Sequence, residues 1–410
     1  MFSRRILTII AFLTISVILI LSFRSNPIPQ KSWQELSEGL SQRIGLGDWA
    51  RKYNGGNETA TQLMHMKPNF HPGTTQPPGY NYTKLLITAR TKGEDVAWME
   101  EHIPDIQKAI YVADDPEAPL HPPQNKGHEV MIYLSYIIDN YDALPDVMIF
   151  MHAHRYAWHN ADLFGSDAGR MIKQLSAERV TREGYVNMRC HWYPGCPDWM
   201  HPGETQYDGQ KSEEILIAHA WAELFPLDPV PDVLAQPCCA QFAVSRDRVR
   251  TIPLEKFLFY RDWLLHTPLQ DFVSGRVWEY MWQFVFTGES FWCPAEDVCY
   301  CDGFGVCFEE GIDGYHRWFE LRGKRNDVND KLLDWEAKRD AIARAIQDGR
   351  VDEAKEMEEP EKGLDQKFRL EMAELTVQME ELVEKGIERG KNPRVRAEVA
   401  GRPFSEGDGF

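Results

Sequence analysis

An uncharged apolar run near the N-terminus is the feature that most constrains this 410-residue chain. Residues 6–23 read ILTIIAFLTISVILILSF, a run just long enough to cross a bilayer. Arg4 and Arg5 precede it, so the positive-inside rule predicts a cytosolic tail of residues 1–5 and a body across the membrane. A cleaved signal peptide is the alternative, although its apolar region is usually about 7–15 residues long. We predict a single-pass membrane protein with a lumenal domain, in the Golgi or the endoplasmic reticulum.

The cysteines and two glycosylation patterns agree with an oxidising compartment. Asn57 and Asn81 each begin an Asn-x-Ser/Thr acceptor pattern after the anchor. The eight cysteines all lie between Cys190 and Cys307, as expected for a disulfide-stapled region in that compartment. A zinc ribbon is the alternative, but the cysteine spacings lack the usual pair of C-x₂-C knuckles.

The sequence leaves the connectivity of these cysteines open, because many pairings are possible. Cys190 and Cys196 bracket a loop that is short enough for a bridge to close it. The adjacent Cys238 and Cys239 are not expected to pair readily with each other.

Charge and aromatic content narrow the classes of partner. The net charge of −18 argues against nucleic acid, because phosphate binding needs clustered Lys and Arg. Aromatic residues make up 12% of the chain, which suits a carbohydrate or another flat ligand. A well-packed secreted core explains the same content more simply.

A proline-rich stem at residues 24–82 is followed by a segment in which short apolar runs alternate with helical patterns. Buried strands are predicted at 85–89, 108–112, 146–151 and 241–245, and helices at 95–101, 127–141 and 277–286. This alternation predicts an α/β domain at residues 83–323, with a mostly parallel sheet flanked by helices and a disulfide-rich end.

Residues 324–410 form a charged tail. Helices are predicted at 328–347 and 367–387, separated around Pro360. A partial apolar stripe on the second helix suits a short coiled coil, a helix lying on the domain or a helical partner, whereas a solvated surface is the commonest explanation. The end of the chain, from Gly390, is expected to be disordered.

Three histidines follow the strand predicted at 146–151. His152 and His154 point to the same side if the strand continues, and His159 lies a few residues further on. Imidazole is a ligand for zinc, manganese, iron or copper, so these residues are the candidate metal site. Histidines that merely form hydrogen bonds are the alternative.

Acidic and basic residues follow the other predicted strands, where ligands of α/β sheets bind. Asp114 and Asp115 could hold a divalent ion or a ribose, although a turn is the commoner role for such a pair. Asp95, next to Glu94, could have a catalytic role or could cap a helix. Lys126 precedes a helix whose first N–H groups could receive a phosphate.

Glu279 lies in the apolar segment VWEYMW, where a carboxylate must be partnered or exposed on one side. It is a candidate general base, and an ion pair with Arg246 is the alternative. The motifs typical of serine hydrolases, P-loop NTPases, dinucleotide-binding enzymes and zincins are absent from the sequence.

Several long motifs resemble a fungal family catalogued as domain of unknown function 3431. They are TARTKGEDVAWMEE, IYVADDP, NKGHEVMIYLSYIIDNYDALPDVMIFMHAHRYAWHN, QFAVSRDRV and VWEYMWQFVFTGE, in that order. The resemblance covers Lys84 to Cys307. More distant relatives have A-R-Y-N-E-D where residues 89–95 here read ARTKGED, and F-x-Q-G where residues 150–153 read FMHA.

The layout of these motifs is also similar to that of GT-A type glycosyltransferases. That resemblance implies that Asp95 contacts the nucleotide, that His152-Ala153-His154 stands where Asp-x-Asp is expected, and that Glu279 is the base. With Arg90, Asp114, Lys126 and Arg246 these residues make up the predicted set for a nucleotide-sugar donor, with Mn²⁺ or another divalent metal as cofactor.

We therefore expect a membrane-anchored glycosyltransferase-like protein that transfers a sugar to an unknown acceptor, with Glu279 or Asp115 activating the acceptor hydroxyl. The first alternative is a metal-dependent oxidase or hydrolase centred on His152, His154 and His159. The second is a non-catalytic, membrane-tethered binding protein whose charged tail is the partner surface.

Overall fold

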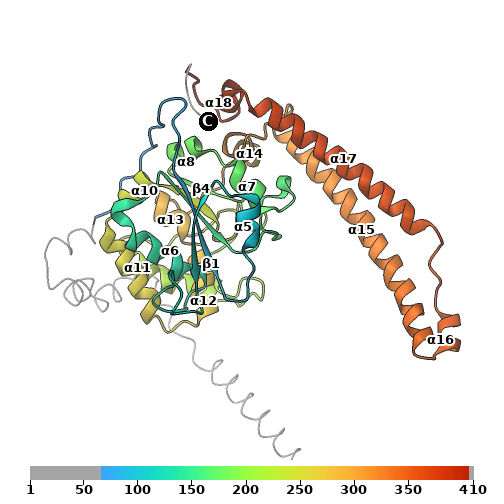
Figure 1. Ribbon diagram of the computed structural model, residues 1–410. Helices are drawn as coiled ribbons and strands as arrows, with labels where there is room; N and C mark the ends of the chain where they lie inside the picture. Colours follow the sequence, from blue (N-terminus) through green and yellow to red (C-terminus); the bar gives the residue numbers. More distant parts are fainter. Residues whose placement is uncertain (1–65, 406–410) are drawn as a thin grey trace, which may run out of the picture.

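The computed structural model describes residues 66–405 and has a five-stranded sheet at its centre (Figure 1). The strands are β1 (Lys84–Arg90), β2 (Gln107–Val112), β3 (Val147–His152), β4 (Tyr185–Asn187) and β5 (Phe242–Ser245). Their order across the sheet is β2-β1-β3-β5-β4. Each of the four strands predicted from the sequence is present, and the α/β fold is confirmed.

The sheet is mixed, so the prediction of a mostly parallel sheet is only partly right. β1 pairs in parallel with β2 and β3, whereas β5 runs antiparallel to both β3 and β4. The chain enters β5 from the edge at which the other four strands end, since the Met188 N–H just after β4 bonds to the Gln241 carbonyl at 3.0 Å. A short apolar run is buried equally well in either direction, and its sequence therefore does not reveal this reversal.

Burial on both faces explains why the strands are apolar runs. In β3, Met148 and Phe150 belong to one core cluster, while Ile149 and Met151 belong to the other. All four side chains are almost completely buried. This alternation follows from the pleat, in which successive side chains point to opposite faces.

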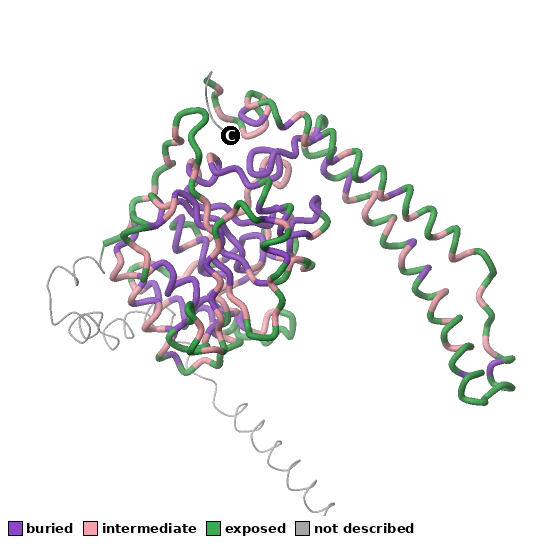
Figure 2. Tube along the Cα trace, viewed as in Figure 1, coloured by how far each residue is buried: buried purple, intermediate pink, exposed green. Residues whose placement is uncertain are grey.

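Helices cover both faces of the sheet (Figures 1 and 2). They are α5 (Ala97–His102), α6 (Glu129–Asp139), α7 (Ala168–Gln174), α8 (Ala177–Glu183), α9 (Glu214–Leu224), α10 (Arg246–Arg250), α11 (Leu254–His266), α12 (Asp271–Glu279), α13 (Trp282–Thr287) and α14 (Glu296–Phe304). Helices α6, α9, α11, α12 and α13 supply the first core cluster, and α5, α7, α8 and α14 supply the second. Two short 3-10 turns lie at Tyr141–Ala143 and Asp162–Phe164.

The single helix predicted at 277–286 is in fact two helices. Helix α12 ends at Glu279 and α13 begins at Trp282. The break lets Trp278 and Trp282 both pack in the core, with their ring centroids 5.0 Å apart. Packing of large rings has here overridden the continuous apolar pattern.

The charged tail forms a long helical hairpin, which we call the arm. It consists of α15 (Ile312–Gln347), α16 (Val351–Glu356) and α17 (Leu364–Gly390), and it projects from the domain (Figure 1). Most of its surface is exposed, whereas a thin line of buried residues runs between its two long helices (Figure 2). The change of composition near residue 324 falls inside α15.

The segment after Gly390 is ordered up to residue 405, contrary to the expected disorder. Helix α18 (Pro393–Val399) packs against α14. Asp302 in α14 is buried and accepts hydrogen bonds from Arg179, Arg182 and Arg402 at 2.8–3.1 Å. Charge pairing across long sequence separations therefore holds the segment around Arg402 against α14.

Four disulfides confirm the stapled region but not the suggested loop bridge. The pairs are Cys190–Cys299, Cys196–Cys293, Cys238–Cys239 and Cys301–Cys307. Cys190 and Cys196 each bridge to a distant partner instead of closing their own loop, and the adjacent Cys238 and Cys239 do pair. The backbone at Cys239 has a φ of +80°, a conformation that most non-glycine residues avoid.

No helix between residues 66 and 405 is long and apolar enough to cross a membrane. The predicted anchor at residues 6–23 lies outside the described residues, as do most of the stem and the acceptor pattern at Asn57.

Candidate functional site

The loops that follow β1, β2 and β3 meet at one edge of the sheet, the carboxyl edge of these strands. The Lys92 N–H donates to Asp114 Oδ1 at 2.8 Å, and Lys92 Nζ lies 3.2 Å from Asp115 Oδ2. Glu94 Oε1 lies 3.3 Å from His154 Nε2. Parallel strands end at the same edge, which is why these polar loops come together.

Two of the predicted residues at this edge also shape their own loops. Asp95 Oδ1 accepts the N–H of Ala97, the first residue of α5, at 2.9 Å, while the N-cap position of α5 is Val96, without a side-chain capping bond. Arg90 donates to the carbonyls of Thr91 and Lys92 at 3.0 and 3.1 Å. The β1 loop is thereby folded locally, whatever else these side chains bind.

His152 and His159 form a close pair. Their Nε2 atoms lie 2.6 Å apart, while the His154 N–H points at His152 Nδ1 at 3.1 Å. If Nδ1 of His152 accepts, its Nε2 must carry the proton and donate to His159. Burial lowers the pKa of His152 to about 3 and that of His159 to about 4, so both rings are neutral at pH 7. The third predicted metal ligand, His154, turns instead toward Glu94.

Neutral imidazole is the form that binds metals. In the part of the chain that the structure describes, however, no three His, Cys, Asp or Glu side chains are grouped so that they could hold a metal ion.

Glu279 ends α12 in a largely buried position. Its Oε2 lies 3.5 Å from Arg276 Nη1, and its side chain accepts the backbone N–H of Cys239. Burial raises the pKa of Glu279, against the effect of Arg276. Arg246, the partner suggested by the sequence, lies beyond the far end of β5 and pairs with Asp146 at 2.9 Å. The suggested ion pair between Glu279 and Arg246 was wrong. The partner of Glu279 is instead Arg276, which lies one helical turn away on the same helix.

A second carboxyl group near Glu279 was missed as a candidate. Glu129 is the first residue of α6. Gly127, just before the helix, has a φ of +73°, and a Cβ at this position would clash with Leu264. Burial raises the pKa of Glu129 to about 7, and the negative charges of Glu279 and Asp271 add to this effect. No motif marks it, because its environment is built by α6 and α12 together.

Lys126 lies just before α6 and faces the end of α11. Its Nζ donates to the Thr267 carbonyl at 2.6 Å. This bond ties two loops together, and Lys126 would have to leave it to contact a phosphate.

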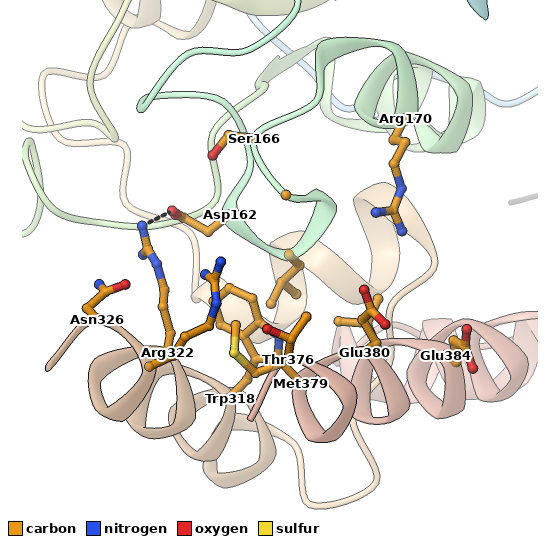
Figure 3. Close-up of a pocket in the computed structure, with 14 residues that line it drawn as sticks. Asp162, Ser166, Arg170, Trp318, Arg322, Asn326, Thr376, Met379, Glu380 and Glu384 are labelled. Atoms are coloured by element: carbon orange, nitrogen blue, oxygen red, sulfur yellow. Dashed lines mark ion pairs between the residues drawn. The ribbon is translucent and has the colours of Figure 1, made fainter. Parts of the chain in front are cut away.

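Arg189 follows β4 and connects the loops after β3 and β4. It is buried, and its Nη2 lies 3.8 Å from Asp162 Oδ2. Asp162 is also paired with Arg322 of the arm at 2.9 Å (Figure 3). The ion pairs therefore run from the arm to the loops at the carboxyl edge.

A cleft of about 550 Å³ separates the loop after Asp162 from the arm (Figure 3). Three basic and three acidic side chains line it, so its charge favours neither sign of ligand. They are Arg170, Arg322, Arg325, Asp162, Glu380 and Glu384.

Comparison with known proteins identifies the family to which the chain belongs. No curated protein and no solved structure matches the chain. The family model described as protein of unknown function (DUF3431) matches residues 86–302, more than half of the chain. The match includes every candidate residue predicted from the sequence, together with Glu129 and Arg189. The chain therefore belongs to the DUF3431 family.

Proposed function

We propose that this chain is a glycosyltransferase-like enzyme with a GT-A-like layout, which transfers a sugar from a nucleotide-sugar to a hydroxyl acceptor. The observation that carries the proposal is the meeting of three loops at the carboxyl edge, through Lys92 with Asp114 and Asp115 and through Glu94 with His154. Ligands of open α/β sheets bind at this edge. The likeness is one of layout, so activity must be tested directly.

On the donor side we assign the nucleotide contacts to Arg90, Asp95, Asp114 and Lys126. Arg90 ends β1, Asp95 and Asp114 lie in loops at the carboxyl edge, and Lys126 lies just before α6. Arg246 is left out of the proposed site, because it pairs with Asp146 beyond the opposite edge.

On the acceptor side we assign the general base to Glu279. The acceptor hydroxyl loses its proton to the Glu279 carboxylate, the acceptor oxygen bonds to the anomeric carbon, and the bond to the nucleoside diphosphate breaks. The diphosphate leaves with the negative charge. Asp115 is the other candidate base, and its Oδ2 is already engaged by Lys92 Nζ at 3.2 Å.

A divalent cation such as Mn²⁺ would neutralise the departing diphosphate. The two nitrogens of His152 and His159 are 2.6 Å apart, whereas neighbouring ligands about 2.0–2.1 Å from one ion stand about 2.9 Å apart or more. No third ligand joins them between residues 66 and 405. As it stands the pair does not complete a metal site, and no step of the proposed reaction passes through a metal.

The test is a panel of nucleotide-sugars against the purified full chain, with and without Mn²⁺. We expect one nucleotide class to raise the unfolding temperature, because a ligand of the folded state stabilises it. We also expect release of the nucleoside diphosphate, which Glu279→Gln slows by roughly 100-fold or more. Glu310→Gln, at an exposed position before the arm, is the matched control. The proposal fails if no nucleotide-sugar binds.

One second candidate, a histidine-centred metal-dependent oxidase or hydrolase, rests on the neutral imidazoles of His152 and His159, which a bound ion would have to move apart. Tightly held copper or iron in the purified chain supports it, and His159→Ala would then release the metal. His219→Ala is the control, since His219 lies on α9 and pairs only with Glu223 among the described contacts. Weak Mn²⁺ binding favours the transferase instead.

We further propose that residues 6–23 anchor the protein in a Golgi or endoplasmic reticulum membrane, with the domain in the lumen. The four disulfides support an oxidising compartment. The exposed Leu333 and Leu370 on the projecting arm support a helical partner there. Glycosylation of Asn81 in cells tests the orientation, because only lumenal sites are modified.

A further inference from the structure

Large aromatic side chains stand exposed in the loops at the carboxyl edge, and Tyr156 after β3, at 62%, is one of them. Two others share a common support. Trp158, in the loop after β3, is 63% exposed, and Tyr193, in the loop after β4, is 66% exposed. Most large rings of the domain pack instead into its two core clusters. An exposed ring alone needs no explanation, but these two share one anchor.

That anchor is the buried guanidinium of Arg189. Its Nη1 donates to the Trp158 carbonyl at 3.1 Å, and its Nη2 donates to the Tyr193 carbonyl at 2.9 Å. A guanidinium is a rigid planar fork, so it fixes the two backbones relative to each other. Arg189 is 4% exposed, and its Nη2 lies 3.8 Å from the carboxylate oxygen Oδ2 of Asp162.

The two rings are also held in place from the side. Trp158 packs edge-to-face on His159 with centroids 5.2 Å apart, and His159 packs in the same way on His152 at 4.6 Å. Tyr193 packs edge-to-face on Trp199 at 6.0 Å. The two disulfides that start from Cys190 and Cys196 staple the Tyr193 loop. Each ring is therefore held in place, and Trp158 is continuous with the histidine pair.

We propose that Trp158 and Tyr193 form a stacking platform that binds a pyranose ring of a neutral glycan. The C–H face of a sugar ring packs on aromatic faces, and ordered Trp and Tyr side chains supply such contact area at low entropic cost. The Arg189 guanidinium is buried and its two terminal nitrogens already donate to carbonyls, so the platform offers no exposed cation to a phosphate or a sulfate. That this glycan is the acceptor rests on the proposed transferase function, whereas the binding itself does not.

A membrane surface is the other structure that takes exposed Trp and Tyr. The net charge of −18 disfavours anionic lipid, and the histidine pair beside the platform is polar. We therefore favour the glycan and treat membrane binding as an outcome of the test.

The experiment uses the purified full chain on an array of neutral and sulfated oligosaccharides, followed by calorimetric titration of the tightest neutral glycan. We expect Trp158→Ala and Tyr193→Ala each to weaken binding about tenfold, and Trp158→Phe to retain most of it. Trp335→Ala, on the arm, should bind like the unchanged chain. Both rings are exposed, so their removal leaves the core intact, and an unchanged unfolding temperature verifies this.

Three results overturn the platform: no neutral glycan binds, both alanine variants bind normally, or the two rings instead mediate binding to phosphatidylcholine–phosphatidylserine vesicles. Nucleotide-sugar binding is measured on the same preparation. Glycan binding without donor binding supports the platform while it removes the transferase, and donor binding without glycan binding removes the platform alone.

Discussion

Replacement of Glu129 by Gln should stabilise this protein at alkaline pH, although Glu129 lies in the candidate site. Burial and nearby carboxylates raise its pKa from 4.5 to about 7 in the folded state. A pKa raised from 4.5 to about 7 corresponds to ~3.4 kcal/mol. Glu129 is partly exposed and its helix N-terminus favours a negative charge, so we expect a net effect of ~1–2 kcal/mol.

The sign follows from proton binding. Between pH 4.5 and about 7 the unfolded chain has lost the proton of Glu129 while the folded chain keeps it, so the free energy of unfolding falls as the pH rises. Gln cannot ionise and escapes this loss. The gain of Glu129→Gln should therefore be absent at pH 4 and complete near pH 8.

Urea unfolding of the full chain at pH 4 and pH 8 measures this difference as a shift of the midpoint at constant slope. Glu117→Gln is the control, because Glu117 is exposed in the loop after β2 and should change stability at neither pH. An equal effect of Glu129→Gln at both pH values, or a loss of stability at pH 8, would refute the assigned environment.

Three further changes probe the rest of the structure. Asp302→Asn should cost ~3–5 kcal/mol in urea unfolding, because it leaves buried arginines unpaired, whereas the exposed Asp340→Asn should change little. His159→Gln should raise the pKa of His152 from about 3, since a neighbouring imidazole is removed. NMR titration measures this pKa, and an unchanged value would contradict the pairing of the two histidines. In the unchanged chain both histidines have lowered pKa values, so their contribution to stability is full above pH 6.5 and is lost as the pH drops below it. Cys190→Ala opens a bridge across 109 residues and should cost ~2–5 kcal/mol, and an unchanged unfolding midpoint would argue against that bridge.

Part of the candidate site could be predicted from the sequence because parallel strands end at one edge. Asp114, Asp115 and His154 were each predicted from their position after a strand, and their loops do meet. Glu129 and Arg189 could not be found in this way. Their roles depend on side chains from several elements, and no local pattern encodes such a neighbourhood.

The sequence by itself determined the α/β class, the places of four strands and the presence of disulfides. These features depend on local apolar runs, periodicity and residue type, which are properties of neighbouring residues in the sequence. Tertiary structure alone decided the direction of β5, the disulfide partners, the break between α12 and α13, and the docking of α18. Each of these depends on contacts between distant segments, which bury large rings or pair buried charges. Such contacts form only when the whole chain packs.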